Sequence, residues 1–199
     1  MAKRRPYRPG LLVLEDGRVF RGGSFGTQGS ACGEAVFATG MSGYQETLTD
    51  PSYQRQIVVM TAPHIGNTGM NSDDEESRRI WVSGFVVRDP SRIASNWRSQ
   101  RTLESDLERF NVVGVCDIDT RALTRHLRDR GAMRAGVFGG AATDADIADL
   151  VAVVEQSPPM AGADLSSEVT TDVAYTVPAQ GERRFRVAAI DLGIKAMTP

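Results

Sequence analysis

Residues 40–53 read GMSGYQETLTDPSY, and residues 57–60 read IVVM. The first run predicts a loop, a short segment with apolar residues and then a rigid turn, because Pro51 fixes its own φ and biases Asp50 towards extended geometry. The second run is continuous and β-branched, which predicts a strand buried on both faces. Together they predict a buried strand that is entered through a turn holding Ser52 in a defined place.

The region before this stretch has the pattern of strands and turns. Residues 11–14 are apolar, and Asp16-Gly17 is a strong hairpin signal. Residues 19–20 can therefore form the second strand of a hairpin. The glycine-rich passage at 22–33 is interpreted as turns between strands. Further short strands are predicted at 35–38 and 81–87.

Beyond residue 100 the apolar residues change to a helical spacing. Leu103, Leu107 and Phe110 recur at i, i+4 and i+7, which is one face of a helix. A second helix is predicted to run from the cap Asp119 to Arg130, with Leu123 and Leu127 inward and Gly131 as its stop. A strand at 112–115 and a third helix at 144–155 complete the pattern. The mixture predicts an α/β fold with β-rich and helical layers.

The C-terminal part predicts a change of domain. Alternating apolar residues at 169–177 indicate an exposed or edge strand, and residues 178–184 read as a linker. A fresh apolar strand is predicted at 185–190. We therefore expect one domain at 1–177, the linker at 178–184, and the incomplete start of a second domain at 185–199.

Composition excludes several classes of protein. The chain has 199 residues and a formal net charge of -2, with one basic cluster at residues 3–9 that is interpreted as a solvated terminus. A near-neutral balance argues against nucleic acid as the main partner. No stretch approaches the roughly 18 apolar residues of a membrane span, and no secretory signal follows the basic cluster. A cytoplasmic protein is expected.

Few residues carry obvious chemistry. Cys32 and Cys116 are interpreted as free structural thiols, Cys32 in a loop and Cys116 in the core. His126 is expected at the boundary of its helix, and His64 is expected to make a structural hydrogen bond, with an interface role left open. Ser52 could be a nucleophile, but no base or G-x-S-x-G elbow accompanies it, so a turn serine with a local backbone bond is the simpler interpretation.

Two other clusters have simple explanations. The four acids at 73–76 could hold a metal, but a solvated helix start explains them more simply, so no metal site is predicted. The glycines at 22–29 match neither G-x-G-x-x-G nor the Walker pattern, so no ATP site is expected in this chain.

The run at 40–53 closely resembles the small, glutamine-handling subunit of carbamoyl phosphate synthetase. Ser42 replaces a common threonine and Met197 an expected asparagine, whereas the other segments follow in order along nearly the whole chain. They are LVLEDG at 12–17, PHIGN at 63–67, DDEES at 73–77, IASNWR at 93–98, DIDTRALT at 117–124 and IDLGIK at 190–195. The last of these resembles the first strand of the class I glutamine amidotransferase domain, which implies a flavodoxin-like α/β start after a mixed β/β/α N-terminal domain.

The resemblance also implies a function. Ser52 matches a serine that contacts bound glutamine, while the nucleophilic cysteine and the His-Glu pair of the family have no counterpart in this chain. The chain would then be inactive alone and would act with a large subunit, which carries ATP and Mg²⁺ and uses the freed ammonia to make carbamoyl phosphate for arginine and pyrimidine synthesis. No cofactor is expected in this chain. The alternative is a stand-alone docking module without chemistry of its own.

Overall fold

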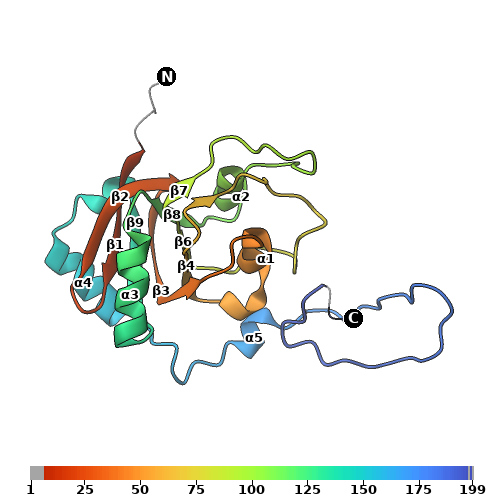
Figure 1. Cartoon of the computed structure of the whole chain (residues 1–199). Coiled ribbons are helices and arrows are strands. Elements are labelled where there is room, and N and C mark those ends of the chain that lie inside the picture. Colours follow the sequence, from red (N-terminus) through yellow and green to blue (C-terminus); the bar gives the residue numbers. More distant parts are fainter. Residues whose placement is uncertain (1–6, 197, 199) are drawn as a thin grey trace.

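A computed structural model describes residues 7–196 and 198 of the chain, and Figure 1 shows its elements in order. Predictions made for the basic residues at 3–6 and for Met197 fall outside the described residues. The described part is a mixed α/β structure, as expected. Its helices are α1 Tyr44–Thr49, α2 Leu103–Arg109, α3 Thr120–Arg130, α4 Ile147–Gln156 and α5 Ser166–Val169, with 3-10 turns η1 Pro51–Tyr53 and η2 Gly140–Thr143.

Strands in the described part close into a barrel, in the order β1-β2-β8-β6-β4-β3-β9, and β5 pairs only with β7. Strands β4, β6 and β8 are parallel neighbours, whereas β1, β2 and β9 pair antiparallel. The strands are β1 Arg8–Leu14, β2 Val19–Gly26, β3 Gly29–Ala38, β4 Gln56–Met60, β5 His64–Ile65, β6 Gly84–Val86, β7 Asp89–Pro90, β8 Val113–Cys116 and β9 Met133–Gly139.

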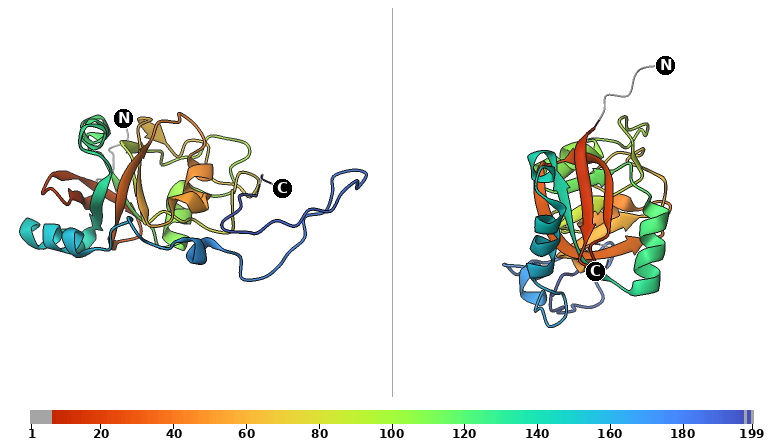
Figure 2. Two further views of the ribbon diagram at one scale, coloured as in Figure 1. Left: turned by 90° about the horizontal axis from the view of Figure 1, so that it is seen from below. Right: turned by 90° about the vertical axis from the view of Figure 1, so that its left-hand side faces the viewer.

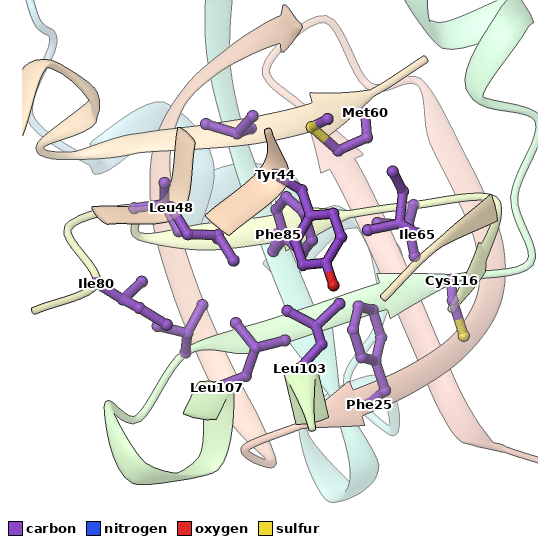
Figure 3. Close-up of a cluster of buried hydrophobic side chains, with 14 of the residues drawn as sticks. Phe25, Tyr44, Leu48, Met60, Ile65, Ile80, Phe85, Leu103, Leu107 and Cys116 are labelled. Carbon is purple, nitrogen blue, oxygen red and sulfur yellow. The ribbon is translucent and has the colours of Figure 1, made fainter. Parts of the chain in front are cut away.

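Strand β4 confirms the prediction of a strand buried on both faces. Ile57 and Val59 belong to one hydrophobic cluster, and Val58 and Met60 belong to another. Alternate residues of a strand point to opposite faces, so one short apolar run contributes to two cores. Figure 3 shows the cluster around Phe85, which side chains from α1 and α2 complete.

Two helices flank the barrel on different sides, as the right-hand view of Figure 2 shows for α3 and α4. Helix α3 begins after Asp119, whose side chain accepts a hydrogen bond of 2.9 Å from the Ala122 amide, and it ends at Gly131 with φ 95°. Leu123 and Leu127 are buried. The predicted cap, end and inward face of this helix are therefore all confirmed. Helices α2 and α4 are also confirmed, with ends that differ by a few residues from the prediction.

The glycine-rich passage is not a set of turns, which corrects the sequence interpretation. Residues 22–26 of the passage lie in β2, and residues 29–33 lie in β3. The reason is close approach of two backbones: a β-carbon at Gly22 would lie 2.1 Å from the carbonyl oxygen of Cys116 on β8. Glycine is thus required by sheet packing here, a role that local sequence does not distinguish from a turn.

Neither strand predicted beyond residue 168 forms in the described chain. Val169 ends helix α5, residues 170–196 contain no strand, and the left view of Figure 2 shows this part extending away from the barrel. A strand needs a partner for its backbone groups, and no strand of the described chain pairs with residues 169–177 or 185–190. Both strand predictions are therefore wrong for this structure, while the domain boundaries remain predictions.

Candidate functional site

The Ser52 turn forms as the sequence predicts. Asp50 is extended, with φ -76° and ψ 118°, and Pro51 opens the 3-10 turn η1. One carboxylate oxygen of Asp50 accepts a hydrogen bond of 2.9 Å from the Ser52 amide, and the Ser52 hydroxyl also bonds to this carboxylate. Pro51 is buried whereas Ser52 is exposed, so the turn presents the hydroxyl to the surface from a fixed backbone.

A residue from far along the chain completes this turn. The ammonium nitrogen of Lys195 lies 2.6 Å from the second carboxylate oxygen of Asp50. Burial opposes ionisation of Asp50, but the hydrogen bonds from Lys195 and Ser52 outweigh it and hold the pKa of Asp50 below its usual value. The bond to Asp50 in turn raises the pKa of Lys195. Both groups are therefore charged at neutral pH.

The segment that carries Lys195 is held by its own local structure. The Asp191 carboxylate accepts hydrogen bonds of 2.9 and 2.8 Å from the amides of Gly193 and Ile194, which lowers its pKa. Gly193 has φ 99°, and a β-carbon there would lie 3.2 Å from the β-carbon of Pro51. The loop at 191–195 therefore packs directly against the Ser52 turn.

Glu76 and Glu168 support the same region from two other segments. The amide of Ala196 donates a hydrogen bond of 2.7 Å to the Glu76 carbonyl oxygen, and one carboxylate oxygen of Glu76 is buried without a hydrogen-bond partner in the described chain. Glu168 on α5 accepts a bond of 2.6 Å from Gln54 and pairs with Arg55. The site thus draws on segments around residues 50, 76, 168 and 195.

The acidic run at 73–76 is not a helix start, which corrects the prediction made for it. These residues lie in irregular structure, where Asp74 pairs with Arg98 at 2.7 Å and Glu75 pairs with Arg101 at 2.8 Å. Arg98 and Arg101 thus join the acidic run to the segment that precedes α2, although that segment is distant in sequence. Across residues 7–196 and 198, no group of three or more His, Cys, Asp or Glu could hold a metal ion.

The cysteines and histidines have surroundings of their own. Cys116 is buried, which raises the pKa of its thiol to about 12, and Cys32 lies on β3 rather than in the predicted loop. Both are free thiols, as predicted. The ring of His126 lies 2.6 Å from Asp16 and 3.0 Å from Arg18, so it joins α3 to the first hairpin. His64 lies 3.3 Å from Asp89, which confirms a structural contact there.

Sequence reasoning singled out Ser52 as a candidate and did not anticipate the contacts of its turn with the Asp50 side chain and Lys195. Asp-Pro-Ser is a signature of a turn stabilised by the aspartate side chain, so Asp50 could have been found. The contact between Asp50 and Lys195 could not, because it spans most of the chain. In chemical terms, the Asp50 carboxylate joins the Ser52 turn to an ammonium group, and a hydroxyl and an ammonium group at one turn can make hydrogen bonds to a small polar ligand.

Comparison with known proteins defines the class of protein that carries this turn. Residues 12–137 match the family described as the carbamoyl-phosphate synthase small chain, CPSase domain. The chain belongs to this family.

Individual relatives agree with the family match. The carbamoyl phosphate synthase small chain of Streptomyces coelicolor is 66% identical over 191 residues, which cover 96% of this chain and 50% of the relative. The protein of the same name from Mycobacterium tuberculosis H37Rv is 62% identical over 194 residues, covering 95% of this chain and 51% of the relative. The chain therefore spans about half the length of these curated relatives.

Proposed function

We propose that this chain is part of the glutamine-hydrolysing small subunit of a carbamoyl phosphate synthase, and that Ser52 contributes to its glutamine site. The observation that carries the proposal is the meeting of the Ser52 turn with Lys195, through Asp50, in a member of this family. Lys195 comes from the segment that resembles the first strand of an amidotransferase domain. On this proposal, the turn would lie where the N-terminal domain and that domain adjoin.

The groups at this place suit an amino acid ligand. Glutamine carries a carboxylate, an ammonium group and a side-chain amide, so it needs donors and acceptors close together. The Ser52 hydroxyl can donate and accept, and the Lys195 ammonium group, paired with Asp50, lies at the same turn and can donate further hydrogen bonds. Asp50 restrains both groups, which reduces the entropy lost when a ligand binds.

The geometry favours binding over nucleophilic attack by Ser52. A serine nucleophile needs a base, and the partner of its hydroxyl is Asp50, whose lowered pKa makes it a poor proton acceptor. The thiols of this chain are also unsuited, because burial raises the pKa of both Cys32 and Cys116. The attacking cysteine is proposed to lie in the part of the subunit that these 199 residues do not span.

In the complete enzyme, that cysteine would attack the side-chain amide of glutamine and release ammonia. Water would then release glutamate from the enzyme. The ammonia would pass to a large-subunit partner, which is proposed to hold ATP and Mg²⁺ and to activate bicarbonate for carbamoyl phosphate synthesis. The chain described here would form one wall of the glutamine site and part of the contact with that partner.

The test is Ser52→Ala in the full-length small subunit assembled with its large subunit. We expect KM for glutamine to rise about tenfold, the effect of losing a hydrogen bond to a charged group, with ammonia-dependent synthesis unchanged. Ser30→Ala, at an exposed serine on β3, is the matched control and should leave both activities intact. The 199-residue chain alone should release no ammonia from glutamine.

Two results would count against the proposal. An equal fall of glutamine-dependent and ammonia-dependent synthesis in Ser52→Ala would assign Ser52 a structural role. Steady glutamine turnover by the 199-residue chain, lost in Ser52→Ala or Cys32→Ala, would show that the nucleophile lies in this chain after all.

A further inference from the structure

A cleft lies at the far end of β4 from the Ser52 turn. The turn precedes β4, whereas the cleft is lined by residues beyond the C-terminal ends of the parallel strands β4, β6 and β8, namely His64, Arg88 and Asp117. Its volume is about 860 Å³, within the usual range of binding pockets. Figure 1 shows β2 and β7 at this end of the barrel and α5 at the other.

Three arginines from separate segments line this cleft: Arg21 on β2, Arg88 after β6 and Arg92 after β7. All three are exposed. Arg88 donates one hydrogen bond of 3.0 Å to the Ile118 carbonyl oxygen, and Arg92 stacks on the Tyr7 ring at 5.0 Å. Within the described residues, the Arg21 side chain has no hydrogen bond or ion pair.

Two carboxylates, Asp89 and Asp117, share the cleft with these arginines. Asp89 faces the His64 ring at 3.3 Å, so part of its charge is already directed at a protein group. Three guanidinium groups against two carboxylates leave a positive excess in a chain whose formal net charge is -2. This excess suits a few carboxylates better than a nucleic acid, which would need a continuous basic face.

The loop that directly follows Arg92 in the chain exposes apolar side chains. Ile93 is 73% exposed and Trp97 is 91% exposed. The loop is nevertheless anchored, because the Ser95 amide donates a hydrogen bond of 2.8 Å to the Asn67 carbonyl oxygen. Exposed tryptophan and arginine together are typical of protein interfaces, whereas a free anion would gain nothing from the apolar side chains.

We propose that this arginine cleft, formed by Arg21, Arg88 and Arg92, receives a carboxylate-bearing segment of the large subunit, with the exposed Ile93 and Trp97 on the loop that follows Arg92 adding apolar contacts. The inference rests on the proposed function, since it assumes that such a partner exists. Guanidinium groups bind carboxylates through paired hydrogen bonds, and the planar fork holds them in a defined orientation. The cleft would thus place the large subunit at the end of the barrel opposite the glutamine site.

The test is the affinity of the full-length small subunit for its large subunit, measured by calorimetry at two salt concentrations. We expect the double variant Arg21→Glu with Arg92→Glu to weaken binding about 10-fold to 100-fold, and more strongly at low salt. Trp97→Ser should weaken binding about fivefold with little salt dependence. Thermal melting of each variant checks that the barrel is intact.

The matched control is Arg121→Glu with Arg125→Glu, which makes the same charge change on the exposed face of α3. The proposal is overturned if the cleft variant binds the large subunit as tightly as this control does. It is also overturned if inorganic phosphate binds the isolated small subunit through the cleft arginines and the large subunit does not compete. If the unmodified small subunit fails to bind the large subunit at all, the proposed function itself is wrong.

Discussion

Phe85 and Phe185 are chemically identical and lie in opposite surroundings. Phe85, on β6, is fully buried in the cluster of Figure 3, whereas Phe185, in the C-terminal part, is 84% exposed. The same contrast separates Val58, which is fully buried, from Val187, which is 85% exposed. Apolar, β-branched sequence therefore does not by itself make a strand in this molecule. The barrel supplies partners to its strands, whereas no strand of the described chain pairs with the part at 170–196.

The largest effect that tests this contrast comes from truncating the two phenylalanines. Phe85→Ala should lower the free energy of unfolding by about 3–5 kcal/mol, because it leaves a cavity in a packed cluster. Phe185→Ala should change the unfolding free energy by less than about 0.5 kcal/mol, because its ring contacts mostly solvent. Urea denaturation of the two variants measures both. A similar loss in each would show that the C-terminal part packs on the barrel in solution.

Substitution of one glycine in the barrel and one in the C-terminal part should give a smaller difference in stability between the two regions. Gly22→Ala should cost about 1–3 kcal/mol, because a β-carbon there meets the β8 backbone. Gly181→Ala has open space around it but a φ of 104°, so it should alter only the local path of the exposed chain. Thermal melting compares the two. Equal melting temperatures for Gly22→Ala and the parent would mean that β2 and β8 are not in close contact.

The smallest effect concerns the ion pair between Asp50 and Lys195, which joins the barrel to the C-terminal part. Asp50→Asn should speed hydrogen exchange of the Ala196 amide about twofold to fivefold, since its ion pair with Lys195 is partly exposed and contributes little. Exchange measured by NMR reports this directly, and Asp172→Asn, at an exposed carboxylate paired with Arg78 at 3.8 Å, serves as the control. Unchanged exchange in Asp50→Asn would show that other contacts hold the segment.

The pH dependence of the contact between Asp50 and Lys195 follows from the shifts in the pKa values of these two groups. Because the pKa of Asp50 is lowered, its contribution is complete above the ordinary value of 3.8 and is lost as the pH falls through the lower pKa of the folded protein. Because the pKa of Lys195 is raised, its contribution is complete below 10.5 and is lost as the pH rises through the higher folded pKa. The Ala196 amide should therefore be protected throughout the neutral range.

Much of the barrel could be predicted from the sequence. Local signals fixed α3, because Asp119 and Gly131 mark its ends and the inward leucines recur at helical spacing. The hairpin at Asp16-Gly17 and the two-sided strand β4 followed from equally local patterns. The sequence did not reveal that the sheet closes, since barrel closure depends on the pairing of β3 with β9 and of β2 with β8.

The candidate site was only partly predictable, for the same reason. Ser52 was proposed as a site residue because Pro51 constrains the turn around it and because the run at 40–53 resembles a known family. Lys195 follows the strand that was predicted at 185–190, and in the structure it lies in a loop that packs on that turn. Glu168, which anchors α5 to the residues after the turn, carried no sequence signal, because a single glutamate on a short helix is indistinguishable from a surface residue.

The sequence by itself determined the local elements of this protein, because capping, turn geometry and apolar periodicity act over a few residues. It also determined the family, since ordered motifs extend along nearly the whole chain. Only the tertiary structure decided that glycines 22 and 23 lie in a strand, that Lys195 meets Asp50, and that three arginines share one cleft. Those outcomes depend on which distant segments come into contact, and burial, pairing and charge compensation exist only once the chain has folded.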